Sequence, residues 1–243
     1  MLGVFDASTL DLLAYSPPGW GATLLRGLWN SVLIATGAYA LGLLIGTAGA
    51  YGKLYGSPLV KDLLSVYTTV VRAVPELVLI LILYFAVTDA VNQIILALGG
   101  NRIEISGVVA GIAVLGVVQG AYATEVLRGA ILAVPTGQIE AARAMGMPAG
   151  LLARRITFPL MLSFAIPGLA NLWLVATKDT ALLAVVGFAE LTQATRQAAS
   201  TTKAFFTFYA AAGVLYLVLS IASTMMFARI ERWARRGQRR TEG

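Results

Sequence analysis

Long runs of apolar residues dominate the chain, and polar residues gather in the short segments between them. Five runs reach the roughly 20 residues that a helix needs to cross a bilayer. They cover residues 30–51, 63–88, 106–133, 161–188 and 205–229. None alternates strictly between apolar and polar residues, as the strands of a membrane barrel do. The pattern predicts an all-α integral membrane protein with five transmembrane helices that contact membrane lipid.

The basic residues of the connecting segments are unevenly distributed between the two sides of this predicted bundle. One side carries eleven and the other carries four: Lys53, Lys61, Arg143, Arg154, Arg155 and six arginines between 229 and 240, against Arg26, Arg102, Arg196 and Lys203. Since cytoplasmic loops are enriched in Lys and Arg, we expect a periplasmic N-terminus and a cytoplasmic C-terminus.

This orientation divides the chain into three parts. A periplasmic segment, 1–29, precedes a single transmembrane domain, 30–229, and a basic cytoplasmic tail covers 230–243. Asp6 and Asp11 precede the first basic residue, Arg26. Because a cleaved signal peptide begins with basic residues, we expect the N-terminal segment to be retained.

Composition excludes most enzyme classes. The residues are 58% hydrophobic and only 12% charged, with a mean hydropathy of +0.79. There is no Cys and no His, so thiolate chemistry, His-ligated metals and imidazole-based catalysis are excluded. Neither HExxH, GxSxG nor a P-loop is present, so we expect no enzyme activity, cofactor or metal in this chain. The net charge of +6 reflects membrane topology rather than binding to nucleic acid.

The predicted cytoplasmic loop, 134–160, contains its own short helix. Ile139–Met145 can form about two turns, with Thr136 or Gly137 as the N-cap. Gly146 suits a left-handed C-cap, because glycine tolerates positive φ without steric cost. A second helix is expected from Ala149, and Pro159 can open the fourth span. On composition alone, this segment is either a contact helix for a partner or an ordinary basic loop.

The spacing E-A-A-x3-G-x9-I-x-x-P supports the partner interpretation. It resembles the EAA signature of the permease subunits of bacterial ABC importers, with Phe158 where leucine is usual. The residues that match the signature or lie within it are Glu140, Ala141, Ala142, Arg143, Gly146, Ile156 and Pro159. The resemblance implies that this loop is a coupling helix that docks on an ATP-hydrolysing subunit.

Four further stretches extend the resemblance over nearly the whole chain. GATLLRGLWNSVLIA, VVRAVPELVLILILYF, GAYATEVLRGAILAVPTGQIEAA and ATKDTALLAVVGFAEL all resemble the polar-amino-acid branch of these permeases. The most similar members are first permease subunits of histidine/lysine/arginine/ornithine importers and of opine importers. The resemblance implies a type I ABC importer permease fold in the bacterial inner membrane.

The resemblance also implies partners. They are a second permease (homologous or identical), a dimer of ABC ATPases that holds ATP and magnesium, a periplasmic solute-binding protein and an amino-acid solute.

Ionisable residues inside the predicted spans are costly there and often mark a solute pathway. Arg72 and Glu76 are four residues apart and are expected on one face of a helix kinked at Pro75. Glu125 and Arg128 are expected to form an ion pair. Lys178 and Asp179, as neighbours in sequence, are expected to point in different directions.

Depth along the spans predicts one polar layer near the middle of the membrane. Its expected members are Glu76, Asp179, Gln119, Tyr122, Tyr216 and Ser220. Two carboxylates in a region of low dielectric constant favour a cationic solute, whose α-carboxylate Arg72 or Lys178 would bind. The alternative is that these side chains only hold helices together.

Two other classes of function remain as rivals. An ion-coupled carrier or channel would use the same polar layer without needing a cytoplasmic partner. A purely structural membrane protein would leave the polar layer without a purpose.

Overall fold

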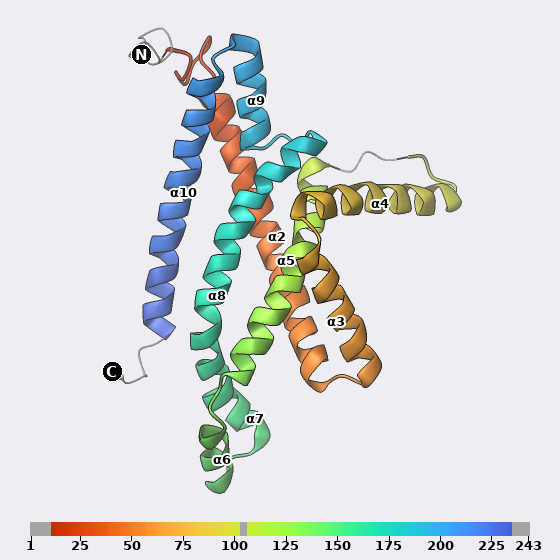
Figure 1. Ribbon diagram of the computed structural model, residues 1–243, viewed down its shortest axis with the longest axis vertical. Coiled ribbons are helices and arrows are strands. Elements are labelled where there is room, and N and C mark those ends of the chain that lie inside the picture. The colour runs from red at the N-terminus through yellow and green to blue at the C-terminus, as the bar shows by residue number, and fades with distance from the viewer. Residues whose placement is uncertain (1–10, 103–105, 235–243) are drawn as a thin grey trace.

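The computed structural model describes residues 11–102 and 106–234, and the regular structure there is helical (Figure 1). The helices are α2 (Gly21–Tyr55), α3 (Pro58–Ala73), α4 (Glu76–Ala97), α5 (Gly107–Leu132), α6 (Thr136–Ala144), α7 (Ala149–Leu152), α8 (Phe158–Asp179), α9 (Leu191–Thr202) and α10 (Phe205–Ala234). A π-helical turn, Ala153–Thr157, joins α7 to α8, and a 3-10 helix, Thr180–Val186, follows α8. The start of the predicted segment 1–29 and most of the predicted tail lie outside the described residues.

Five helical stretches of the described chain are long and apolar enough to cross a membrane, which confirms the predicted all-helical, five-span class. They are Gly21–Tyr55, Glu76–Ala97, Gly107–Leu132, Ala149–Val186 and Phe205–Ala234. Three boundaries differ clearly from the prediction. The fourth helical stretch begins at Ala149 rather than at residue 161. The first helix begins at Gly21 rather than at residue 30, and the last continues to Ala234 rather than ending at residue 229.

The second predicted span, 63–88, was wrong. The helix ends at Ala73, and a new one begins at Glu76 after an extended Val74 and Pro75. The physical reason is proline, which lacks an N–H group and disfavours helical backbone at the preceding residue. In Figure 1, α4 runs across the long axis of the bundle, whereas α2, α5, α8 and α10 follow it. Arg72 and Glu76 therefore lie on two different helices, and not on one face.

Small residues allow α2 and α5 to pack closely along the centre of the bundle. Gly42, Gly46 and Gly49 of α2 are buried against α5. A Cβ atom at Gly42 would lie 2.8 Å from the Cβ of Gln119, and one at Gly46 would overlap Ala123. Interfaces of small residues are a common way for membrane helices to approach without a hydrophobic driving force. This contact fixes where the polar side chains of α5 face.

The short helices α6 and α7 lie at one end of the bundle, and α9 lies at the opposite end (Figure 1). Helix α6 begins at Thr136 with Pro135 as its N-cap, so the predicted caps Thr136 and Gly137 were wrong. Pro135 is itself extended, and its ring fixes φ near the value that the residue before a helix can adopt. The predicted start of α7 at Ala149 and the position of Pro159 in the first turn of α8 are confirmed.

Candidate functional site

A buried polar cluster forms where α5 meets α4 and the end of α8. The Tyr122 hydroxyl on α5 donates to Glu76 Oε1, the first residue of α4, at 3.4 Å. One turn earlier on α5, Gln119 Nε2 donates to Asp179 Oδ2 at 3.3 Å. Asp179 is only 8% exposed although it is the last residue of a membrane helix. The cluster therefore holds one buried and one half-buried carboxyl group.

Four of the six predicted solute-pathway residues form this cluster: Glu76, Gln119, Tyr122 and Asp179. The other two, Arg72 and Lys178, are exposed and lie at its edge. The Glu76 and Asp179 carboxyl groups are near enough to interact electrostatically. Arg72 interacts electrostatically with Tyr122, and Lys178 interacts with Asp179. Lys178 is exposed whereas Asp179 is buried, which confirms that these neighbours point in different directions. The break at Pro75 places Arg72 at the end of α3 and Glu76 at the start of α4, whereas sequence reasoning had assigned both to a single helix.

One acceptor of the cluster is left unpartnered. Gln119 is 2% exposed, and among the described residues its Oε1 atom has no hydrogen-bond partner. A buried polar atom without a partner is costly, and such atoms are rare in folded proteins. The cluster therefore has unused acceptor capacity beside two acidic groups, which suits a ligand that donates hydrogen bonds.

The EAA-like segment forms a protruding contact surface. Helix α6 buries only Ala142, while Glu140, Ala141 and Arg143 are exposed. Gly146 has φ of +75°, and its N–H donates to the carbonyl of Arg143 at 2.9 Å. Met145 is 86% exposed, the highest value among the large exposed apolar side chains of the described chain. Ile156 lies in the π-helical turn behind this surface, and Pro159 begins the long helix that follows.

Comparison with known proteins identifies the family. Residues 38–236 match the family described as the binding-protein-dependent transport system inner membrane component. The chain is a member of this family. The permease is therefore a transport component of the inner membrane and not an enzyme.

Curated relatives cover almost the whole permease. The nopaline transport system permease protein NocQ of Agrobacterium fabrum is 43% identical over 95% of this chain and 98% of its own. The octopine transport system permease protein OccQ of Rhizobium radiobacter is 36% identical over the same shares. The histidine/lysine/arginine/ornithine transport system permease protein HisQ of Escherichia coli is 40% identical over 88% of this chain and 94% of its own.

Solved structures share the fold of the permease. An amino acid ABC transporter crystallised with histidines matches with a TM-score of 0.75 and 29% identity, covering 88% of this chain and 94% of that one. The MetNI methionine ABC transporter in an inward-facing conformation matches with a TM-score of 0.69 over 90% of this chain and 99% of that one. Its 21% identity shows the fold alone.

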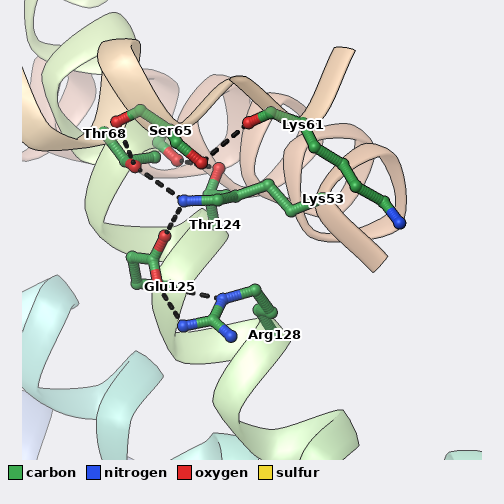
Figure 2. Close-up of polar contacts among 8 residues, drawn as sticks. Lys53, Lys61, Ser65, Thr68, Thr124, Glu125 and Arg128 are labelled. Atoms are coloured by element: carbon green, nitrogen blue, oxygen red, sulfur yellow. Dashed lines mark hydrogen bonds and ion pairs between the residues drawn. The ribbon is translucent and has the colours of Figure 1, made fainter. Parts of the chain in front are cut away.

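Figure 2 shows a second polar cluster of the permease, formed by Lys53, Thr68, Glu125 and Arg128. Its Glu125 follows Tyr122 of the first cluster by three residues on α5. Glu125 Oε2 accepts from Arg128 Nη2 at 2.8 Å, which confirms the predicted pair. Sequence reasoning missed Lys53, whose Nζ lies 2.6 Å from Glu125 Oε1 and 2.9 Å from Thr68 Oγ1. Lys53 had been counted as a loop cation because it follows the first apolar run. Only the packing of α2 on α5 reveals its partner.

Glu190 organises the end of the permease opposite α6, and it was also missed. Its carboxylate caps α9 by accepting from the backbone N–H groups of Thr192 and Gln193 at 2.8 and 2.6 Å. It also accepts from the Tyr216 hydroxyl at 3.1 Å and from Ser31 at 3.4 Å. Tyr216 therefore belongs to this cap and not to the predicted polar layer. The position of Tyr216 along its own helix does not reveal this contact. The contact depends on Glu190, which precedes α9 and reaches Tyr216 of α10.

Proposed function

We propose that this permease carries polar amino acids with basic side chains, or opines, across the inner membrane in an ATP-driven importer. The named solutes of the relatives NocQ, OccQ and HisQ support this class. The observation that carries the proposal is the placement of two carboxyl groups, the half-buried Glu76 and the buried Asp179, which Tyr122 and Gln119 of α5 contact. The free acceptor Gln119 Oε1 lies beside Asp179. Two acidic groups in one buried site are stabilised by a cation, because each loses much of its hydration there.

Each member of the cluster has a role in this proposal. The guanidinium or ammonium group of the solute would bind between Glu76 and Asp179, and would donate to Gln119. Its α-carboxylate would bind Arg72 or Lys178, the cations at the edge of the cluster. Tyr122 holds Glu76 in place through its hydroxyl group. A neutral side chain of the same length could not offset the two carboxylates.

The proposed partners follow from the contact surface and the family. A dimer of ABC ATPases, which holds ATP and magnesium, would dock on the exposed side of α6 around Met145. A second permease subunit would complete the pore, and a periplasmic binding protein would deliver solute. In the proposed cycle of alternating access, closure of the ATPase dimer moves the coupling helices, the packed spans follow as rigid bodies, and the solute site opens outward. Hydrolysis of ATP reverses the movement.

Two solute classes remain within the proposal. The 43% identity to a nopaline permease favours an opine, and the 40% identity to HisQ favours a free basic amino acid. The acidic cluster suits the cationic part of either. Uptake of radiolabelled arginine, lysine and nopaline by the assembled importer ranks the candidates directly.

The charge-recognition role is tested with Glu76→Gln in the assembled importer. We expect uptake of the basic solute to fall by about 10- to 100-fold, because a charged hydrogen bond is lost, while any transport of a neutral analogue such as citrulline falls less. Asp89→Asn is the matched control, since Asp89 is an exposed acid on the same helix. Equal losses for cationic and neutral solutes would refute charge recognition.

A further inference from the structure

The second polar cluster, which we call the Lys53 cluster, joins three helices through a series of polar contacts, drawn in Figure 2. Glu125 and Arg128 come from α5, Lys53 from α2 and Thr68 from α3. Each Glu125 oxygen has its own cation, Oε1 with Lys53 and Oε2 with Arg128. The Lys53 ammonium also donates to Thr68, whose hydroxyl in turn donates to the carbonyl of Ser65. Among these polar contacts, the one from Lys53 to Thr68 is therefore the only one that reaches α3 from the other two helices.

Burial makes these contacts consequential. The Lys53 and Glu125 side chains are 13% and 17% exposed. An exposed ion pair contributes little, but breaking a largely buried one leaves an uncompensated charge. Thr68 is buried as well, so its oxygen would lose a charged donor if Lys53 were shortened.

Helix α3 is also held by apolar packing, because Val71 and Tyr67 of α3 pack against Val118 and Ala121 of α5. Its buried residues are Thr68 and Val71. The Tyr67 hydroxyl adds one hydrogen bond, to the carbonyl of Val117 on α5. Much of the remaining surface is apolar and exposed, including Leu63 and Val66. The Lys53 contact therefore adds a charged link between α3 and α5 to this apolar packing.

The two helices that it joins lead to different functional parts. After α5 the chain reaches α6, the proposed coupling helix, through the short turn 133–135. After α3 it reaches Glu76, and Arg72 is in the last turn of α3 itself. We propose that Lys53 is a positioning residue that makes α3 and its solute-binding residues move with the coupling helix. This inference rests on the proposed import function for α6 and Glu76.

The test compares Lys53→Met with Lys53→Arg in the complete importer reconstituted in lipid nanodiscs. Without the ammonium, we expect stimulation of ATP hydrolysis by the solute-loaded binding protein to fall about tenfold, while basal hydrolysis and complex assembly persist. Lys53→Arg keeps the charge and should restore most of the stimulation. Lys61→Met is the control, because Lys61 is an exposed lysine on α3. A proportional fall of basal and stimulated rates would show a merely structural role and overturn the proposal.

A distance measurement tests the same link without relying on transport. The chain contains no cysteine, so two introduced cysteines are the only labelling sites in this subunit. Spin labels at Leu63 on α3 and Leu132 on α5, both exposed, report the separation of the two helices. We expect one narrow distribution with and without trapped ATP in the wild type, and a broad or shifted one in Lys53→Met. Unchanged distances in the variant would refute the link, whereas absent ATP-driven uptake in the wild type would refute the import function alone.

Discussion

At the scale of single residues, Glu190 shows how one buried carboxylate can organise an end of the bundle. It is fully buried, and its hydrogen-bond donors come from α2, α9 and α10. All of these donors are neutral. Burial raises the pKa of the Glu190 carboxyl above its ordinary value of 4.5, although the four hydrogen bonds oppose the shift. The loss of hydration therefore affects the Glu190 pKa more than the hydrogen bonds to the carboxylate do.

This raised pKa predicts a pH dependence of stability. The contribution of Glu190 is fully present below its unfolded-state pKa and is lost as the pH rises through the higher folded-state value. We expect the thermal unfolding midpoint of the solubilised permease to fall over this range, measured between roughly pH 4 and pH 8. Glu190→Gln should remove this part of the slope. The amide NH2 group of the glutamine would face a backbone N–H group that needs an acceptor. We therefore expect the variant to lose about 1–3 kcal/mol of folding stability at low pH. Asp62→Asn, an exposed acid, should keep the wild-type slope; the same slope in Glu190→Gln would contradict the assignment.

At the scale of helices, the packing of α2 on α5 positions both polar clusters. Gln119, Tyr122 and Glu125 lie on the helix that the α2 glycines contact. A shift of α2 by the width of one side chain would separate Lys53 from Glu125. Close packing is therefore a requirement for the site and not only for the fold.

Gly46→Leu tests this requirement. Its side chain would overlap Ala123, so we expect a loss of about 1–3 kcal/mol in stability, together with reduced uptake. Gly213→Leu is the control, because a Cβ atom at that position of α10 meets nothing within 4 Å. Thermal unfolding and uptake of the two variants are compared at equal expression. Similar behaviour of both would argue against a tight α2–α5 contact.

At the scale of the whole molecule, the subunit leaves extensive apolar surface uncovered. Helix α4 runs across the bundle and exposes Val78, Ile82, Phe85, Ile94 and Leu96. Apolar side chains of a membrane helix can face lipid, so the exposed α6 is the part of this surface that points to the larger assembly that we propose. An ion-coupled carrier would need no such assembly.

The energy source distinguishes these two classes. For the assembled importer in proteoliposomes, we expect uptake to continue after ionophores collapse the proton and sodium gradients, because the driving force is mechanical work at α6. Replacement of ATP by a non-hydrolysable analogue should stop net uptake. Uptake that follows an ion gradient in the absence of ATP would instead establish a carrier.

The sequence alone determined the class of the protein and much of its candidate site. Hydrophobic runs define membrane helices because the bilayer leaves backbone groups no other partners, and rare ionisable residues within them stand out. The pairing of Glu125 with Arg128 and the turn at Gly146 followed from local geometry, which one helix fixes by itself.

Only the tertiary structure decided which helices bring polar groups together. The sequence showed Pro75 but not that the helix ends there and a new one begins in another direction. Arg72 and Glu76 were therefore placed on one helix. Lys53 and Glu190 have partners far away in sequence, at Glu125 and Ser31, and no local pattern encodes such contacts. Helix pairing depends on complementary surfaces, here the glycines of α2, and that information appears only when the chain is folded.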